Sequence, residues 1–150
     1  MHTQSEQGTS ACAARFAAVL KPGTVVLLSG DLGAGKTAFV RGMAAGLGLD
    51  PDEVNSPTFT LIQEYRGPRT LSHVDLYRVE SAEIDELGLE ELSESGAIVA
   101  IEWAEKLKRP PLGAIRVEIL DKGEDEREIR ISRDSERASA GDRPRVYSDR

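Results

Sequence analysis

A glycine-rich stretch near the start of the chain, SGDLGAGKT, combines residue types that bind phosphate at fixed spacing. It fits the pattern G-x-x-x-x-G-K-[ST] through Gly30, Gly35, Lys36 and Thr37. Glycine lets the backbone come close to a ligand, so consecutive N–H groups can point at phosphate oxygens. A helix that begins near Lys36 would add the positive end of its dipole. The stretch therefore predicts a phosphate-binding loop in a nucleotide site.

The two residues that close the loop have separate expected roles. The ammonium group of Lys36 would reach the β and γ phosphates, and the hydroxyl of Thr37 would supply one ligand to an octahedral Mg²⁺ ion. The alternative is a plain strand-to-helix turn without a ligand. The apolar run TVVLL before the loop and the helical pattern after it are the context that the phosphate motif requires. We therefore favour the nucleotide site over the turn.

ATP is a better candidate for this site than GTP. The chain has no N-K-x-D segment that would read guanine. A D-x-x-G match occurs at Asp85 to Gly88, but it lies in an acidic, helix-like segment with no strand directly before it. The expected cofactors are therefore ATP and Mg²⁺.

Two carboxylates are candidates for the metal side of the site. Glu102 ends the apolar run AIVAIE, and a buried strand that delivers a charge at its carboxyl end suits a Mg²⁺ ligand or a water-positioning group. Asp75 lies in SHVDLYR, where two-residue periodicity puts His73, Asp75 and Tyr77 on one face of a strand. A polar face of this kind is usually solvated. We expect His73 to be a structural or hydrogen-bonding residue rather than a general base.

Two further features lie beside these candidates in the sequence. Trp103 is the only tryptophan and follows Glu102, and we expect it to pack, with base stacking or a partner contact as alternatives. In SPTFT, Ser56 and Thr58 flank a proline at a position after the loop helix that would suit a switch sensing the γ phosphate. As a bare pattern, SPTFT is a turn.

The bulk composition limits the class of protein. The chain has 150 residues, which is the length of one domain. Its net charge of −7 opposes direct binding of a polyanion, so a nucleic acid would be carried by another protein. Cys12 is the only cysteine, which excludes an internal disulfide and favours a small buried residue over a reactive thiol. The chain has neither an apolar run near the roughly 20 residues of a membrane span nor a signal-peptide core, so we expect a soluble cytoplasmic protein.

The elements that must hold the loop are those of an α/β protein. Residues 9–20 predict a helix capped by Thr9 or Ser10. The apolar run at 24–29 predicts a central strand covered on both faces, and residues 37–49 predict the helix after the loop. Strand, loop and helix in this order form the opening of a nucleotide-binding unit.

The rest of the chain predicts two hairpins around another buried strand. The hairpins are expected to be antiparallel, and the second should have one wet face. Together these elements indicate a P-loop NTPase-like α/β fold, with a mixed sheet of parallel core and antiparallel hairpins flanked by helices, in one ATPase domain over residues 1–132. Residues 133–150 have almost nothing to bury and predict a disordered tail. The expected elements are a hairpin of 58–65 and 70–78, an acidic helix and turn at 81–92, a strand at 97–103, and a hairpin of 114–120 and 127–132.

Four segments together resemble the TsaE family of small bacterial P-loop ATPases, formerly called YjeE. They are SGDLGAGKTAFVRG, SPTFTLIQEY, HVDLYR and IEWAEK, and the resemblance covers residues 9–132 in unbroken order. It implies a role in making N6-threonylcarbamoyladenosine in tRNAs that read codons starting with A. It further implies that the chain joins the partner proteins TsaB and TsaD, that its ATP hydrolysis sustains the multi-turnover cycle, and that partners contact the tRNA.

The resemblance also implies roles for individual residues. Thr37 and Glu102 would hold Mg²⁺, and Asp75 would be essential for hydrolysis, either by orienting water or through the metal. Lys36, Asp75 and Glu102 would be the catalytic residues. Arg127, in EREIRI, matches a family position near the nucleotide. The residues expected to contact the nucleotide are Leu32, Gly33, Ala34, Gly35, Lys36, Thr37, Thr58, Trp103 and Arg127.

Two other functions use the same loop. A small-molecule kinase would need an acceptor pocket and an arginine-bearing lid, whereas the basic residues here gather near the end of the chain. A nucleotide-gated binding module would work with ATP bound and uncut. The leading hypothesis is an ATPase with weak hydrolysis alone, stimulated when a partner completes the site.

Overall fold

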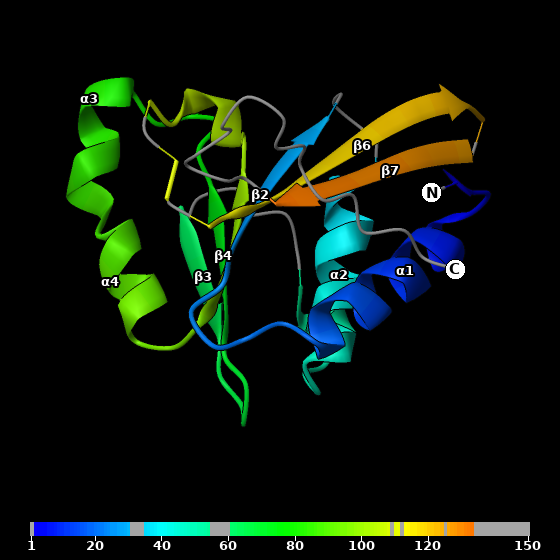
Figure 1. Cartoon of the computed structure of the whole chain (residues 1–150), viewed down its shortest axis with the longest axis horizontal. Coiled ribbons are helices and arrows are strands. Elements are labelled where there is room, and N and C mark those ends of the chain that lie inside the picture. The colour runs from blue at the N-terminus through cyan, green and yellow to red at the C-terminus, as the bar shows by residue number, and fades with distance from the viewer. Residues whose placement is uncertain are drawn as a thin grey trace, which may run out of the picture.

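The computed structural model describes residues 2–30, 35–54, 61–108, 110–111, 113–124 and 126–133. In these residues, seven strands form one sheet in the order β1-β7-β6-β2-β5-β4-β3. Helices lie on both sides of it (Figure 1). The strands are β1 His2–Thr3, β2 Val25–Gly30, β3 Ile62–Tyr65, β4 Leu71–Asp75, β5 Ile98–Glu102, β6 Ile115–Gly123 and β7 Glu126–Arg133. The α-helices are α1 Glu6–Ala18, α2 Lys36–Gly46, α3 Ser81–Ile84 and α4 Leu89–Glu94, and the 3₁₀ turns are Pro51–Glu53, Asp85–Leu87 and Ala104–Lys106.

The sheet has a parallel centre with antiparallel additions at both edges. Strand β2 pairs in parallel with β5 and β6, and β4 pairs in parallel with β5. Strands β3 and β4 form one antiparallel hairpin, and β6 and β7 form the other. The mixed α/β sheet predicted from the sequence is therefore confirmed.

Two apolar cores lie on the two faces of this sheet. In β2, Val26 and Leu28 face the side covered by α1 and α2, whereas Val25 and Leu27 face the side covered by α3 and α4. All four side chains are buried. A strand buried on both faces reads as a continuous apolar run, which explains why the central strand could be recognised in the sequence.

Helices α1 and α2 pack closely because glycines face α1. A Cβ on Gly42 would overlap the carbonyl oxygen of Ser10, and a Cβ on Gly46 would overlap that of Ala14. Close approach of this kind is possible only where the side chain is absent. Since α2 begins at Lys36, this contact also fixes the helix that carries the end of the loop.

The predicted boundaries of the first helix were wrong. The helix begins at Glu6, and the side chain of Ser5 caps it by accepting a hydrogen bond from the N–H of Gly8 (2.9 Å). Thr9, expected as a cap, is instead buried, and its hydroxyl bonds that of Thr3 (2.7 Å). Ser5 could cap the helix earlier because the preceding residues are held in β1 against β7.

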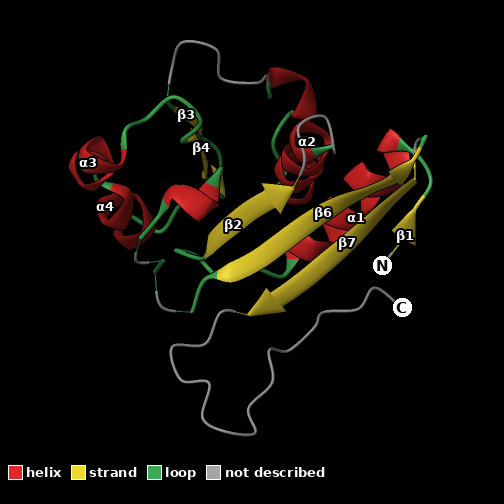
Figure 2. Ribbon diagram, turned by 90° about the horizontal axis from the view of Figure 1, so that it is seen from above, coloured by secondary structure: helices red, strands yellow, loops and turns green. Residues whose placement is uncertain are grey.

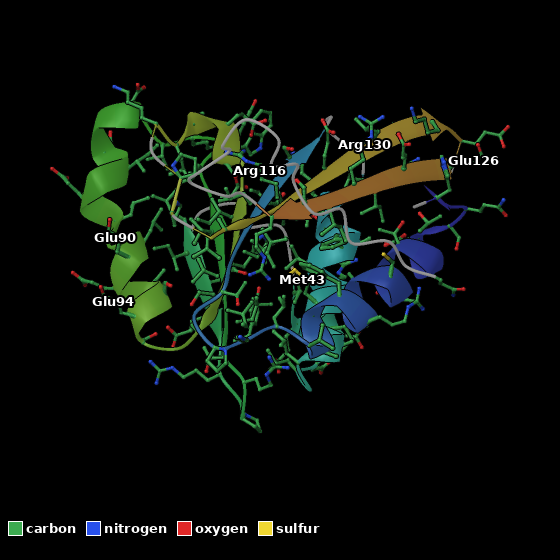
Figure 3. All side chains as sticks on the ribbon, in the orientation of Figure 1. Met43, Glu90, Glu94, Arg116, Glu126 and Arg130 are labelled. Atoms are coloured by element: carbon green, nitrogen blue, oxygen red, sulfur yellow. The ribbon has the colours of Figure 1, made fainter. Side chains whose placement is uncertain are left out.

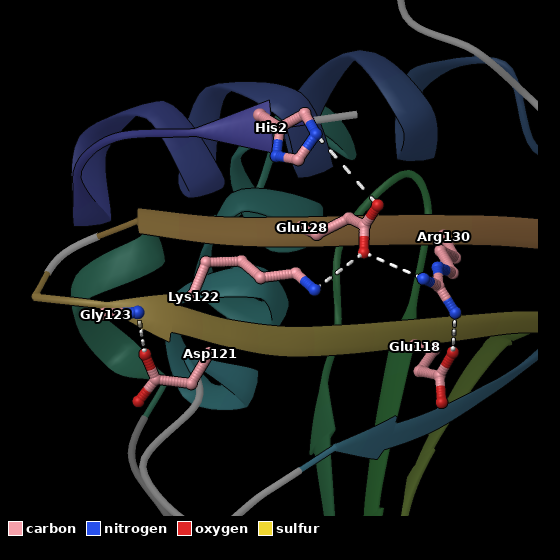
Figure 4. Close-up of polar contacts among 7 residues, drawn as sticks. All are labelled: His2, Glu118, Asp121, Lys122, Gly123, Glu128 and Arg130. Atoms are coloured by element: carbon pink, nitrogen blue, oxygen red, sulfur yellow. Dashed lines mark hydrogen bonds and ion pairs between the residues drawn. The ribbon is translucent and has the colours of Figure 1, made fainter.

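The outer face of the β6–β7 hairpin is charged. Figure 4 shows Glu128 between Arg130, at 3.0 Å, and Lys122, at 3.4 Å, with Glu118 on the far side of Arg130. These ion pairs are partly exposed, so each contributes little to stability. The expected hairpin with one wet face is confirmed, since Ile129 and Ile131 on the opposite face are buried.

Helix α4 has an exposed acidic surface, whereas α2 packs into the core. Glu90 and Glu94 lie on the exposed surface of α4, whereas Met43 of α2 is fully buried (Figure 3). One acidic helix and a turn were predicted for 81–92, whereas the structure has two short helices, α3 and α4, with a 3₁₀ turn between them. Cys12 is buried, as expected. Within the described residues, no helix has both the length and the apolar character to span a bilayer.

Candidate functional site

Three parallel strands end at the same edge of the sheet and bring the predicted loop and carboxylates together. Strand β2 ends at Gly30, β4 at Asp75 and β5 at Glu102. In the sheet register, Leu28 and Asp75 both lie opposite Glu102. The arrowhead of β2 ends beside α2 in Figure 2. Ligands of open α/β sheets bind beyond the carboxyl ends of the strands, which is the position of this group.

Lys36 is the first residue of α2 and is almost buried, with 7% of its surface exposed. Its Nζ donates a hydrogen bond to the carbonyl oxygen of Gly30 (3.3 Å). The same ammonium group lies 4.4 Å from the centre of the Trp103 ring. The charge is therefore held at the mouth of the loop by a carbonyl and an aromatic face.

The two glycines that bound the loop have backbone conformations that favour glycine. Gly35 has φ 99°, in the left-handed region, directly before α2. Gly30 has φ 146°, and a Cβ there would overlap the carbonyl oxygen of Ile119 on β6. Leu32, Gly33 and Ala34 lie outside the described residues, as does Thr58. Thr37 is the second residue of α2 and is partly exposed.

Glu102 and His73 form a buried polar pair next to the loop. Glu102 is 6% exposed and His73 is fully buried. Nε2 of His73 lies 2.5 Å from Oε2 of Glu102, and since the carboxylate accepts, the ring nitrogen donates. The expectation of a solvated polar face on β4 was therefore wrong for His73, because α2 and its neighbours cover that face. The expectation that His73 forms a structural hydrogen bond is confirmed.

Asp75 lies at the end of β4 beside this pair. Its Oδ1 accepts a hydrogen bond from the N–H of Tyr77 (2.9 Å). Burial raises the pKa of the Asp75 carboxyl above its ordinary value, and the nearby Glu102 carboxylate raises it further. The bond from Tyr77 and the charges of His73 and Lys36 act in the opposite direction without cancelling these effects. The Asp75 carboxyl is therefore poorly solvated and lies close to a second carboxylate.

Trp103 links the loop lysine to a second aromatic side chain. Its ring centre lies 4.8 Å from that of Tyr77, and its backbone has φ 61°, which is unusual for a large side chain. Lys106 donates to the carbonyl oxygens of Tyr77 (2.6 Å) and Val79 (3.2 Å). The expected packing role of Trp103 is confirmed, since it packs partly buried against the core on the α3–α4 side. Its contact with Lys36 was not expected, because the two residues are far apart in the sequence.

Arg127 comes from the opposite part of the chain and approaches the loop. Its Nε lies 3.8 Å from the position that a Cβ on Gly35 would take. Its Nη1 donates to Oδ1 of Asp121 (3.2 Å) and to the carbonyl oxygens of Glu124 and Glu126 (2.9 Å each). A guanidinium group is therefore fixed beside the glycine that precedes α2.

Comparison with known proteins identifies the relatives of this chain. The family model for threonylcarbamoyl adenosine biosynthesis protein TsaE matches residues 3–129. The chain belongs to the TsaE family. It is 45% identical over 129 residues to the tRNA threonylcarbamoyladenosine biosynthesis protein TsaE of Bacillus subtilis, covering 85% of this chain and 80% of that protein. It is 46% identical over 122 residues to the TsaE protein of Rickettsia bellii, covering 78% and 84%.

A solved structure supports the same assignment. The crystal structure of YdiB from Bacillus subtilis aligns with a TM-score of 0.69 and 40% sequence identity, over 86% of this chain and 80% of YdiB. The resemblance inferred from the motifs and the P-loop fold class are therefore both confirmed. Membership of the TsaE family marks the chain as a P-loop protein of the ATPase type.

The residues at the strand ends fit a magnesium nucleotide. Lys36 and the start of α2 carry positive charge that would suit a phosphate group. Asp75 and Glu102 are oxygen donors, the ligand type that Mg²⁺ prefers. Burial raises the pKa of Asp75 and the neighbouring Glu102 carboxylate raises it further, and a divalent cation bound beside the two carboxylates would favour their charged forms.

Proposed function

We propose that this chain hydrolyses ATP with Mg²⁺ as a subunit of the machinery that forms N6-threonylcarbamoyladenosine in tRNAs reading codons that start with A. The observation that carries the proposal is the convergence of Lys36, Asp75 and Glu102 at one edge of the sheet in a chain of the TsaE family. The relatives are named as tRNA threonylcarbamoyladenosine biosynthesis proteins.

The loop and α2 would bind and position the nucleotide. Lys36 would leave the Gly30 carbonyl and contact the β and γ phosphates, while the main chain from Leu32 to Gly35 would donate its N–H groups to them. Trp103, with Lys36 at its ring face, would line the same pocket, and Thr58 would belong to a segment that responds to the γ phosphate.

The carboxylates would act on the metal and the attacking water. Thr37 and Glu102 would hold Mg²⁺, which would neutralise charge on the phosphate oxygens when bound. Asp75 would orient the water or share the metal. Its partial burial keeps the carboxylate poorly solvated, which strengthens either interaction.

Arg127 is the side chain that could contribute positive charge from outside the loop. It lies beside Gly35 but is committed to Asp121 and to two carbonyl groups. We propose that it contacts the nucleotide and that hydrolysis is weak until partners complete the site. An added cationic contact can raise phosphoryl-transfer rates by about 10³ or more in such enzymes.

The partners in this proposal are the TsaB and TsaD proteins. The net charge of −7 gives the chain no general attraction for tRNA, so tRNA contact would fall to them. The ATPase domain would comprise residues 1–132, and the chain would act in the cytoplasm without a membrane. Arg133, expected in the tail, is the last residue of β7, and residues 134–150 lie outside the described residues.

The test is reconstitution with purified TsaB and TsaD proteins. ATP turnover should rise when they are added, and modified tRNA should accumulate beyond one equivalent per complex. Glu102→Gln should assemble with the partners but stop after about one turnover. Unchanged turnover together with no binding to the partners would refute the proposal. Transfer of the phosphate to a metabolite would instead indicate a kinase.

A further inference from the structure

The His73 side chain is a buried polar group that the proposed chemistry does not require. It lies on β4 between the buried residues Leu71 and Val74, in a strand that also carries Ser72 and Asp75. Placing an imidazole ring in such a position costs free energy unless its nitrogens find partners. An aliphatic side chain would fill the same place without that cost. The ring therefore needs an explanation beyond packing.

The partner of the ring explains its presence. Nε2 donates to Oε2 of Glu102, across the adjacent strands β4 and β5. Nδ1 is buried and has no hydrogen-bond partner among the described residues. Within that part of the chain, the bond to Glu102 is the polar interaction that orients the ring, and it reaches a carboxylate that is itself almost buried.

We propose that His73 is a positioning residue for Glu102. Its N–H holds one carboxylate oxygen, so that the other oxygen is presented toward Mg²⁺ at the end of β5. The inference rests on the proposed function, in which Glu102 shares the metal. Groups that orient a metal ligand through a hydrogen bond commonly change metal affinity by about 10–100-fold when they are removed.

Two amide variants separate this role from packing. In His73→Gln the side-chain amide can reach the position of Nε2 and keep a donor for Glu102. In His73→Asn the side chain is one carbon shorter than in the Gln variant, so its amide nitrogen can take only the position of Nδ1. This variant keeps a polar side chain but loses the hydrogen bond to Glu102. The readout is the affinity of the full chain for a non-hydrolysable ATP analogue, measured by calorimetry with Mg²⁺ and with EDTA.

We expect His73→Asn to reduce the gain in affinity that Mg²⁺ provides by about 10-fold or more, with His73→Gln within about threefold of the wild type. Affinity in EDTA should be the same for all three. If His73→Asn does not fold, the Gln variant decides alone: a retained Mg²⁺ gain supports the inference. The inference would be overturned if a folded His73→Gln variant lost the gain in affinity from Mg²⁺. It would also be overturned if His73→Asn weakened analogue binding equally with Mg²⁺ and with EDTA.

Glu102→Gln in the same assay distinguishes the two proposals. If it loses the Mg²⁺ gain while His73→Asn keeps it, the metal role of Glu102 stands and only the role of His73 fails. If Glu102→Gln keeps the whole gain, the proposed metal role fails and the inference about His73 fails with it.

Discussion

Replacing Lys36 by methionine tests the phosphate contact with little change in packing. Methionine keeps the apolar stem beside Trp103 and removes the charge that now lies 4.4 Å from the ring centre. A hydrogen bond to a charged group is worth about 1.5–3 kcal/mol. Contacts with the β and γ phosphates would give two such bonds. In return Lys36 gives up its bond to Gly30, also worth about 1.5–3 kcal/mol, and part of its contact with the ring, worth about 0.5–1 kcal/mol. The net loss should be about 1–2 kcal/mol.

That loss corresponds to roughly 5- to 30-fold weaker binding of an ATP analogue, which titration calorimetry measures directly. Lys106→Met is the matched control, because Lys106 also has aromatic and carbonyl partners but binds the backbone of Tyr77 and Val79. It removes the same charge and should stay within about twofold of the wild type. Equal affinity in Lys36→Met and the wild type, or equal losses in both variants, would refute the phosphate role of Lys36.

Two further predictions concern stability. Asp75→Asn should abolish hydrolysis yet stabilise the nucleotide-free protein at neutral pH. The pKa of Asp75 in the folded protein is raised above its ordinary value of 3.8. The wild type therefore loses stability as the pH rises from 3.8 through the folded-state pKa, and the Asn variant does not. In urea unfolding, the difference in free energy of unfolding between the Asn variant and the wild type should shrink as the pH falls toward about 4. A less stable Asn variant at neutral pH would contradict this prediction. Gly42→Ala should lower the free energy of unfolding by about 1–2 kcal/mol, because overlap with Ser10 outweighs the gain in helix propensity. Gly8→Ala would place a Cβ 3.3 Å from Oγ of Ser5 and 3.5 Å from Cβ of Thr3, which are side-chain atoms, so it should be much less destabilising. Equal melting temperatures for the two variants would argue against close packing of α1 and α2.

The sequence predicted the elements whose signals are local. The central strand is apolar on both faces, so β2 could be recognised from its composition, and the loop motif predicted that α2 begins near Lys36. The start of α1 was misjudged because Ser5, Thr9 and Ser10 are all capable caps. The choice among them depends on the pairing of β1 with β7, which no local pattern reveals.

Lys36, Asp75 and Glu102, which were proposed from the sequence, lie at one edge of the sheet, but the contacts of the candidate site could not be predicted. The bond between His73 and Glu102 joins residues 29 positions apart and depends on the register of β4 and β5. From periodicity alone, the face of β4 that carries His73 and Asp75 was expected to be solvated. Nothing in SHVDLYR indicates which face of the strand α2 covers. The approach of Arg127 to Gly35 likewise depends on the antiparallel return of β7.

The most direct test of the account is a crystal structure of the chain with a non-hydrolysable ATP analogue and Mg²⁺. The account predicts that Nζ of Lys36 contacts the β and γ phosphates, and that the metal lies about 2.0–2.1 Å from the Thr37 hydroxyl with Glu102 or Asp75 beside it. An analogue bound away from the end of β2, or a metal remote from both carboxylates, would contradict it.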